Sequence, residues 1–254
     1  MNRTTFSLLA VAGVAVLVLG GERLSGQAAV LPAMLKESIA SYGSLTSYSD
    51  TGTVRWESPG IVDQEEFTTY FRRPTRDFYF DYQALTSTNP GTKFTIDMRD
   101  YRSVIWMLNG NMQRYDRKSR TQEAVSSGQA GALQTAAHRT RGTSLLIPSL
   151  LYTQAGLSGT ITQIEGGQLA GTETINGRAC QKITGTAVMI LSGRRNNERA
   201  VTVWIDAESR LIRRVFEDAK GLPGNTYSRL TVTLDPRANP TIEDARFQFK
   251  VPSP

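Results

Sequence analysis

Few side chains in this sequence could perform acid–base or nucleophilic chemistry. The single histidine, His138, lies in an Ala-rich polar stretch, and no G-x-S-x-G nucleophile motif precedes it. A Ser–His–acid site would have to use this residue, whereas a lone histidine in a polar helix is more often a surface residue. We therefore expect His138 to be exposed and to take no part in catalysis.

The sequence also lacks the residues that usually bind metal ions or phosphate groups. A zinc site needs several His or Cys ligands, and the chain has one of each, His138 and Cys180. Cys180 lies in an alternating run, which predicts a buried small hydrophobic residue and argues against an intermolecular disulfide. The glycines at 166–167 and 156–159 lack the helix and Lys-Ser/Thr of a phosphate-binding loop. We expect no cofactor and no metal ion.

One acidic run, Asp63-x-Glu65-Glu66, is the remaining candidate for catalysis. Two carboxylates on separate strands could serve a glycosidase, but nothing in the sequence pairs this run with another acid. We interpret it as solvated charge in a hairpin loop. Asp206 is expected to start a turn through its side chain. Because the usual catalytic clusters are missing, an enzyme is the least favoured hypothesis.

Aromatic and aliphatic side chains are the more informative feature. Phe78, Phe80 and Tyr82 alternate along one predicted strand, so they share a face opposite to Tyr79 and Asp81. Their arrangement favours an apolar pocket for an acyl chain or a hydrophobic peptide, although an ordinary core is the alternative for each residue. The other residues expected to line this pocket come from neighbouring strands and from a Leu-rich cover: Trp56, Tyr70, Trp106, Leu145, Leu146, Leu150 and Leu151.

Strands must position most of these residues. Helical spacing predicts one helix over residues 31–42, and a period of two then runs to about residue 118. Residues 119–156 predict a loop, a helix over 129–139 and a short helical segment over 144–154 that is kinked near Pro148. The pattern of strands resumes at Thr160. The strands predicted in this second part are 160–165, 171–175, 179–191, 200–205, 211–217, 228–234 and 247–251, with a hairpin turn at Asn176-Gly177.

The predicted fold is mainly β within the α+β class. It is one large antiparallel sheet with its helices segregated to one face, and a sheet of this many strands curls and encloses a cavity. No internal repeat or linker divides the chain. Residues 29–254 are therefore expected to form a single domain.

The N-terminus has the three parts of a secretory signal peptide. Arg3 is followed by an apolar run over residues 6–20 and by small residues at Gly26 and Ala28. The apolar run is shorter than the ~20 residues of a spanning helix, which disfavours the alternative of an uncleaved anchor. We expect cleavage after residue 28. No Cys lies near this site, so we expect a soluble protein without a lipid anchor.

The charge of the chain excludes some partners. The formal net charge is +6, and the basic residues are scattered without the dense patch of a nucleic-acid-binding protein. A solvated basic surface is favoured, and a weak attraction to anionic lipid head groups is the alternative. We expect a monomer that does not bind nucleic acid.

Several segments together resemble the periplasmic lipoprotein-carrier superfamily, which includes LolA, LolB and the related domain of the RseB regulator. The similarity extends over most of residues 31–252 and is greatest to the uncharacterised periplasmic members. The segments that carry it are 244–252, which looks like the last strand of the carriers, Arg72-Arg73-Pro74 with Phe78-Tyr79-Phe80, 100–106, 177–183 and 203–206.

The resemblance implies an unclosed β-barrel with a helical lid over an apolar cavity. In the carriers, an Arg that precedes a Pro hydrogen-bonds the lid, and the matching position here is Arg73. A guanidinium has five donors and can satisfy carbonyls at a helix end, although a solvated strand-end charge is the alternative. Residues 119–143 do not match the lid of the carriers closely.

Two functional hypotheses follow. The first is a soluble periplasmic protein that binds or carries a lipid, an acyl chain or a lipoprotein without covalent chemistry. The second is an interaction or sensor module that binds a membrane protein of the cell envelope, as the regulator branch of the resembled superfamily does.

Overall fold

The structure is a computed structural model that describes residues 32–125, 128–152, 157–191, 194–219 and 228–251. The expected signal peptide, residues 1–28, lies outside the described residues. Among the residues that are described, no helix is long and apolar enough to span a bilayer.

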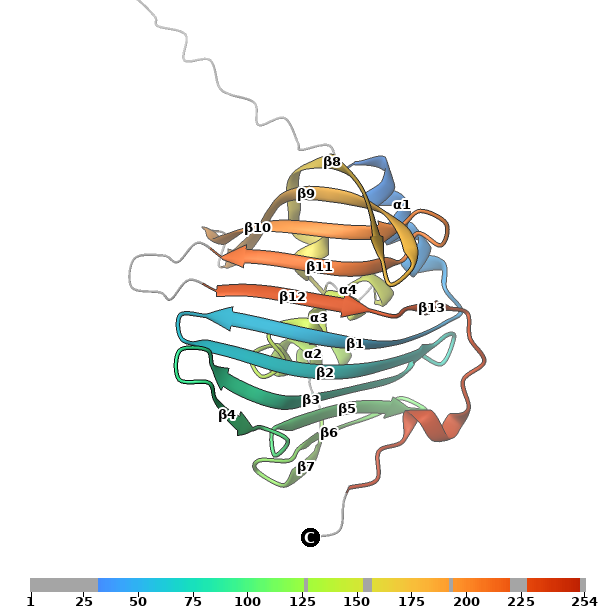
Figure 1. Ribbon diagram of the computed structural model, residues 1–254. Helices are drawn as coiled ribbons and strands as arrows, with labels where there is room; N and C mark the ends of the chain where they lie inside the picture. Colours follow the sequence, from blue (N-terminus) through green and yellow to red (C-terminus); the bar gives the residue numbers. More distant parts are fainter. Residues whose placement is uncertain (1–31, 126–127, 153–156, 192–193, 220–227, 252–254) are drawn as a thin grey trace, which may run out of the picture.

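One antiparallel sheet of thirteen strands dominates the molecule (Figure 1). Its order along the main path is β7-β6-β5-β3-β2-β1-β12-β11-β10-β9-β8, with β4 beside β3 and β13 beside β1. The strands are β1 (Ser47–Ser58), β2 (Ile61–Arg72), β3 (Asp77–Asn89), β4 (Phe94–Asp97), β5 (Arg102–Leu108), β6 (Asn111–Asp116), β7 (Thr121–Ala124), β8 (Ile164–Ile175), β9 (Arg178–Leu191), β10 (Arg194–Asp206), β11 (Ile212–Ala219), β12 (Ser228–Leu234) and β13 (Arg237–Ala238). Since β7 and β8 are not paired with each other, the sheet is not closed.

The helices lie on one face of this sheet (Figure 1). They are α1 (Ala33–Ser44), α2 (Gly128–Ala137), α3 (Thr143–Leu146) and α4 (Pro148–Leu151). We call α2, α3 and α4, with their connections, the lid (residues 128–151), and we call the face of the sheet that they cover the inner face. Two 3-10 helices, η2 (Thr160–Gln163) and η3 (Asp244–Phe247), complete the elements. The predicted fold class is therefore confirmed.

The alternation of side chains explains why the core lies between the inner face and the lid. In β3, Phe78 and Phe80 are fully buried, whereas Tyr79 and Asp81 between them are only partly buried. The register pairs Phe78 with Phe71 of β2, so buried rings from adjacent strands meet on the same face. These rings form one buried cluster with apolar residues of the lid.

Most predicted strands agree with the structure, and four predictions are wrong. Residues 121–124, predicted as loop, form β7. Residues 160–163 form a 3-10 helix, and 164–175 form one strand, so the break predicted at 166–170 appears only as shifts in register. Residues 247–251, predicted as a strand, form none. Instead, η3 and the segment after it pack across β3 and β5 through their side chains.

Candidate functional site

The inner face and the lid bring together most of the residues predicted to line a pocket. Phe78, Phe80 and Tyr82 of β3 belong to the same buried cluster as Leu146, Leu150 and Leu151 of the lid. Trp56 and Leu145 are partly buried and pack against this cluster. After α4, the ring of Tyr152 lies edge-on to Phe71 and Phe78, with centroids 5.1 and 5.6 Å apart. The lid is thus closed on the aromatic surface of the sheet.

Arg73 connects the sheet to the C-terminal end of the lid. Its guanidinium follows β2 and donates hydrogen bonds to the carbonyl oxygens of Leu45, just after α1, and of Leu151, the last residue of α4. The guanidinium also lies 4.8 Å from the centre of the Phe71 ring. Burial lowers the pKa of this group, and no carboxylate of the described residues pairs with it. The expected contact between Arg73 and the lid is confirmed, whereas its role as a latch stays a prediction.

Arg141 connects the middle of the lid to the same strand. It lies in the connection between α2 and α3, and Nη2 is 2.6 Å from Oδ2 of Asp63 in β2. Nε is 3.4 Å from Oε1 of Glu65, and the guanidinium stacks 4.1 Å from the centre of the Trp56 ring. The lid is therefore held to the sheet by one arginine contact at the α2–α3 connection and another at the end of α4.

A pocket of about 700 Å³ opens beside Arg141. Its buried wall includes Glu65 and Tyr82, whose exposed fractions are 5% and 3%. Burial raises the pKa of Glu65, while the neighbouring Tyr82 hydroxyl and Arg141 lower it. The remaining lining residues are Asp63, Ala84, Thr86, Met98, Tyr101, Arg102, Ser103, Asp116, Lys118, Ser119, His138 and Arg139.

The acidic run is not a solvated hairpin loop, and this interpretation was wrong. Asp63, Glu65 and Glu66 all lie within β2, and only Glu66 of the three is exposed. Glu65 falls in phase with Phe67, Thr69 and Phe71, so the period of the strand places it on the inner face. This phase was the available sequence signal for Glu65. No local sequence pattern could identify the role of Arg141, because its partners Asp63 and Glu65 are more than seventy residues away.

Two of the predicted pocket residues lie on the outer face of the sheet. Tyr70 and Trp106 are paired with Tyr79 in the register, and Tyr79 points away from the inner face. The C-terminal segment packs on this surface, where the ring of Phe249 lies 5.4 Å from Trp106 and 5.1 Å from Tyr115. Tyr70 and Trp106 therefore do not share a pocket with Phe78 and Phe80.

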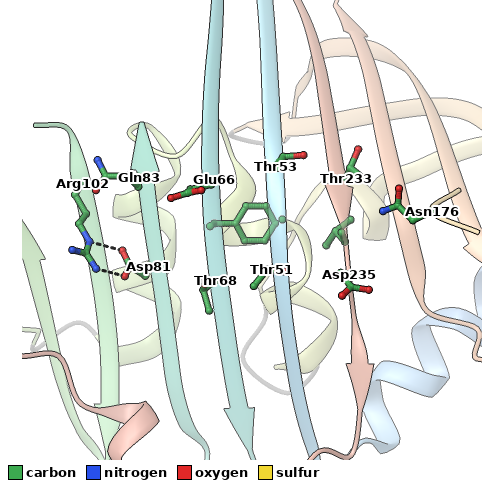
Figure 2. A pocket seen from close by; sticks show the side chains of 13 residues that line it. Thr51, Thr53, Glu66, Thr68, Asp81, Gln83, Arg102, Asn176, Thr233 and Asp235 are labelled. Atoms are coloured by element: carbon green, nitrogen blue, oxygen red, sulfur yellow. Dashed lines mark hydrogen bonds and ion pairs between the residues drawn. The ribbon is translucent and has the colours of Figure 1, made fainter. Parts of the chain in front are cut away.

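The outer face also carries a polar groove of about 590 Å³ (Figure 2). Arg102 and Asp81 form a bidentate pair at one end of it, with N–O distances of 2.8 and 2.5 Å. The other polar residues of the groove are Thr51, Thr53, Glu66, Thr68, Gln83, Asn176, Thr233 and Asp235. The sheet separates this groove from the lid.

Three further residues considered in the sequence have defined positions in the structure. His138 is exposed at the end of α2, and Cys180 is buried beside Ile175 and Trp204, both as expected. Asp206 accepts hydrogen bonds from the backbone N–H groups of Glu208 and Ser209, which confirms the predicted turn. The described residues contain no group of three or more His, Cys, Asp or Glu that could hold a metal ion.

A buried polar cluster underlies the inner face near α1. The hydroxyl of Tyr48 donates to Oδ2 of Asp50 at 2.8 Å, and the Tyr42 hydroxyl accepts from the backbone N–H of Ile212 at 3.0 Å. Burial raises the pKa of Asp50 to about 6, against the opposing effect of hydrogen bonds from Thr69 and Tyr48. Sequence analysis missed this carboxylate, although it falls in phase with the buried Tyr48.

The unclosed sheet, the lid and its two arginine contacts define the class of this protein: one open antiparallel β-sheet covered on one face by a helical lid. The family described as "Predicted periplasmic protein (DUF2092)" matches residues 115–254, which is more than half of the chain. The chain belongs to this family. The expected membership of a periplasmic family is thereby confirmed. No curated protein shows significant sequence similarity to the chain.

Solved structures of similar fold include two mycobacterial proteins. The lipoprotein LppX of Mycobacterium tuberculosis is 17% identical with a TM-score of 0.45, over 83% of this chain and 96% of that one. LprF of Mycobacterium bovis is also 17% identical with a TM-score of 0.45, over 87% and 95%. A chain of the Pseudomonas aeruginosa MucA/MucB complex is 14% identical with a TM-score of 0.42, over 85% and 60%.

Proposed function

We propose that this protein is a non-enzymatic periplasmic carrier that holds the acyl chain of a lipid or lipoprotein between its lid and the inner face of the sheet. The observation that carries the proposal is the contact of Arg73 with the end of α4. In the described part of the chain, side-chain hydrogen bonds, ion pairs and an apolar surface hold the lid, so it can separate from the sheet without breaking a β-ladder.

The apolar side chains under the lid supply the binding surface. Leu146, Leu150 and Leu151 are at most 4% exposed, and they face the rings of a strand pair. Lifting them into water costs roughly 1.5–3 kcal/mol for each fully buried side chain. An acyl chain that fills the space between lid and sheet restores these apolar contacts, so the open lid is stable only when a ligand occupies it.

Replacing Arg73 tests the proposal. Arg73→Leu removes the hydrogen bonds to Leu45 and Leu151, and we expect about tenfold weaker binding of a fluorescent fatty acid, corresponding to roughly 1.4 kcal/mol. Limited proteolysis within residues 128–151 should become faster in the same variant. Arg178→Leu is the matched control, because the Arg178 side chain is 56% exposed, pairs with Glu208 and lines neither pocket. Unchanged binding and proteolysis in Arg73→Leu would contradict the latch.

A second candidate is a module that binds an envelope membrane protein, and the exposure of β8 favours it. β8 ends the sheet, so one side of its backbone has no partner strand among the described residues, and Leu169 within it is 62% exposed. Native mass spectrometry of protein purified from its own periplasm distinguishes the two candidates. A co-purifying lipid mass supports the carrier, whereas a lipid-free protein in complex with a membrane protein supports the module.

A further inference from the structure

The pocket beside Arg141 is acidic at its buried wall. Asp63 and Glu65 approach the single guanidinium of Arg141, so when both acids are ionised this wall carries one excess negative charge. The side chain of Glu65 is 5% exposed, which makes an uncompensated charge at this position costly.

Three polar atoms of this wall form no hydrogen bond of ordinary geometry within the described structure, although the Tyr82 hydroxyl lies close enough to Glu65 to lower its pKa. They are Oδ1 of Asp63, Oε2 of Glu65 and the hydroxyl of Tyr82. Two of the three atoms can only accept hydrogen bonds when the acids are ionised. Buried acceptors of this kind are normally paired, so the wall is suited to a ligand group that donates several hydrogen bonds and carries a positive charge.

The rim of the same pocket has the opposite character. Lys118 is exposed, and its ammonium lies 4.7 Å from the centre of the Tyr101 ring. Arg139 is 58% exposed and pairs with Asp116, and His138 lies beside it. Lys118 has no carboxylate partner among the described residues. The rim is therefore suited to a group of negative charge close to the surface.

We infer that this pocket binds a zwitterionic head group with a primary ammonium at the buried wall and a phosphate at the rim. Glu65, Asp63 and Tyr82 accept hydrogen bonds from the ammonium, and Lys118 and Arg139 face the phosphate. This inference rests on the proposed function and deepens it, because Arg141 at this pocket stacks on Trp56, which packs against the apolar cluster beneath the lid. The ligand class is thus a phosphoethanolamine lipid.

Other head groups satisfy fewer of these atoms. A quaternary ammonium such as choline carries the same charge but has no N–H donor for Glu65 or Tyr82. A glycerol head group donates hydrogen bonds but carries no positive charge against the acidic wall. Each of these alternatives leaves part of the wall unpaired and should bind more weakly.

Calorimetric titration of the purified protein tests the inference with three lysophospholipids of equal chain length. We expect lysophosphatidylethanolamine to bind at least tenfold more tightly than lysophosphatidylcholine or lysophosphatidylglycerol. Equal binding of all three would overturn the head-group inference and leave the proposed acyl carrier intact. Failure of all three to bind would overturn both. Water-soluble phosphoethanolamine that binds as tightly as its lipid would support the head-group inference and contradict the acyl carrier.

Variants assign the effect to the wall and the rim. Glu65→Gln should weaken lysophosphatidylethanolamine about tenfold and leave lysophosphatidylcholine unchanged, whereas Glu66→Gln, its exposed neighbour, should change neither. Lys118→Ala, an exposed change that does not endanger folding, should weaken all three lipids several-fold through the lost phosphate contact. If Glu65→Gln reduces the binding of all three lipids equally, or if Lys118→Ala has no effect, the assignment is wrong.

Discussion

Asp50 illustrates how a single buried carboxylate affects this protein. Its exposed fraction is 3%, and the Tyr48 hydroxyl donates a hydrogen bond to Oδ2 at 2.8 Å. Burial raises its pKa from 3.8 to about 6, so the folded state binds the proton of this group more tightly than the unfolded state does. The stability that this proton contributes is complete below pH 3.8 and is lost as the pH rises through 6.

Asp50→Asn should therefore remove a pH-dependent part of the stability. Relative to the wild type, the variant should gain at most about 3 kcal/mol in free energy of unfolding between pH 4 and pH 7.5. Urea unfolding at both pH values measures this difference. Asp100→Asn, a change at an exposed carboxylate, is the control. An equal stability difference between Asp50→Asn and wild type at both pH values would contradict the assignment.

Sequence patterns predicted correctly which face of the sheet some of the candidate site residues occupy. The period of two placed Phe78, Phe80 and Tyr82 on one face because alternation is a local property of a strand. It could not relate the phase of that strand to those of its neighbours, and Tyr70 and Trp106 were consequently assigned to the wrong face. The register that decides the face is set by pairing between strands, and a single sequence does not contain it.

The C-terminal segment acts as an element of the outer face although it forms no strand. Arg72 lies 4.9 Å from the centre of the Phe247 ring and forms an ion pair with Asp244 at 2.7 Å. Phe249 covers Trp106 and Tyr115. These contacts close the outer surface over β2, β3 and β5, so the segment stabilises the sheet opposite to the lid.

Phe249→Ser should weaken this attachment. We expect a loss of about 1–2 kcal/mol in free energy of unfolding, because the ring is partly buried and its removal exposes Trp106. The fluorescence of the tryptophans during urea unfolding measures both effects. Phe94→Ser is the matched control, since Phe94 is 64% exposed and its loss should cost less than about 0.5 kcal/mol. Equal stability of the two variants would show that the segment is not attached through Phe249.

The elements were more predictable than their ends. Alternating β-branched and aromatic residues identified β9 and β12, and Asn176-Gly177 supplied a turn in which both residues have positive φ. β7 was missed because Thr121–Ala124 is polar and exposed, and only pairing with β6 makes it a strand. The tail at 247–251 has the composition of a strand, but packing through Phe249 determines its conformation.

At the scale of the whole molecule, ligand binding and stability are coupled. A lipid that binds only the folded protein stabilises it by about 2.7 kcal/mol at a concentration of 100 times Kd. For a chain of this size, we expect a rise of roughly 5–10 °C in Tm with lysophosphatidylethanolamine. The rise should be smaller in Arg73→Leu. A Tm that does not respond to the lipid at saturating concentration would contradict binding to the folded state.

Both arginine contacts of the lid are made to β2 or to the residue that follows it. Glu65 and Arg73 are eight positions apart, which corresponds to roughly 26 Å along an extended strand. The lid thus contacts the sheet at two separate positions along β2 and the residue after it. Breaking either contact leaves the other intact. Loss of either contact alone is therefore expected to free only the adjacent part of the lid.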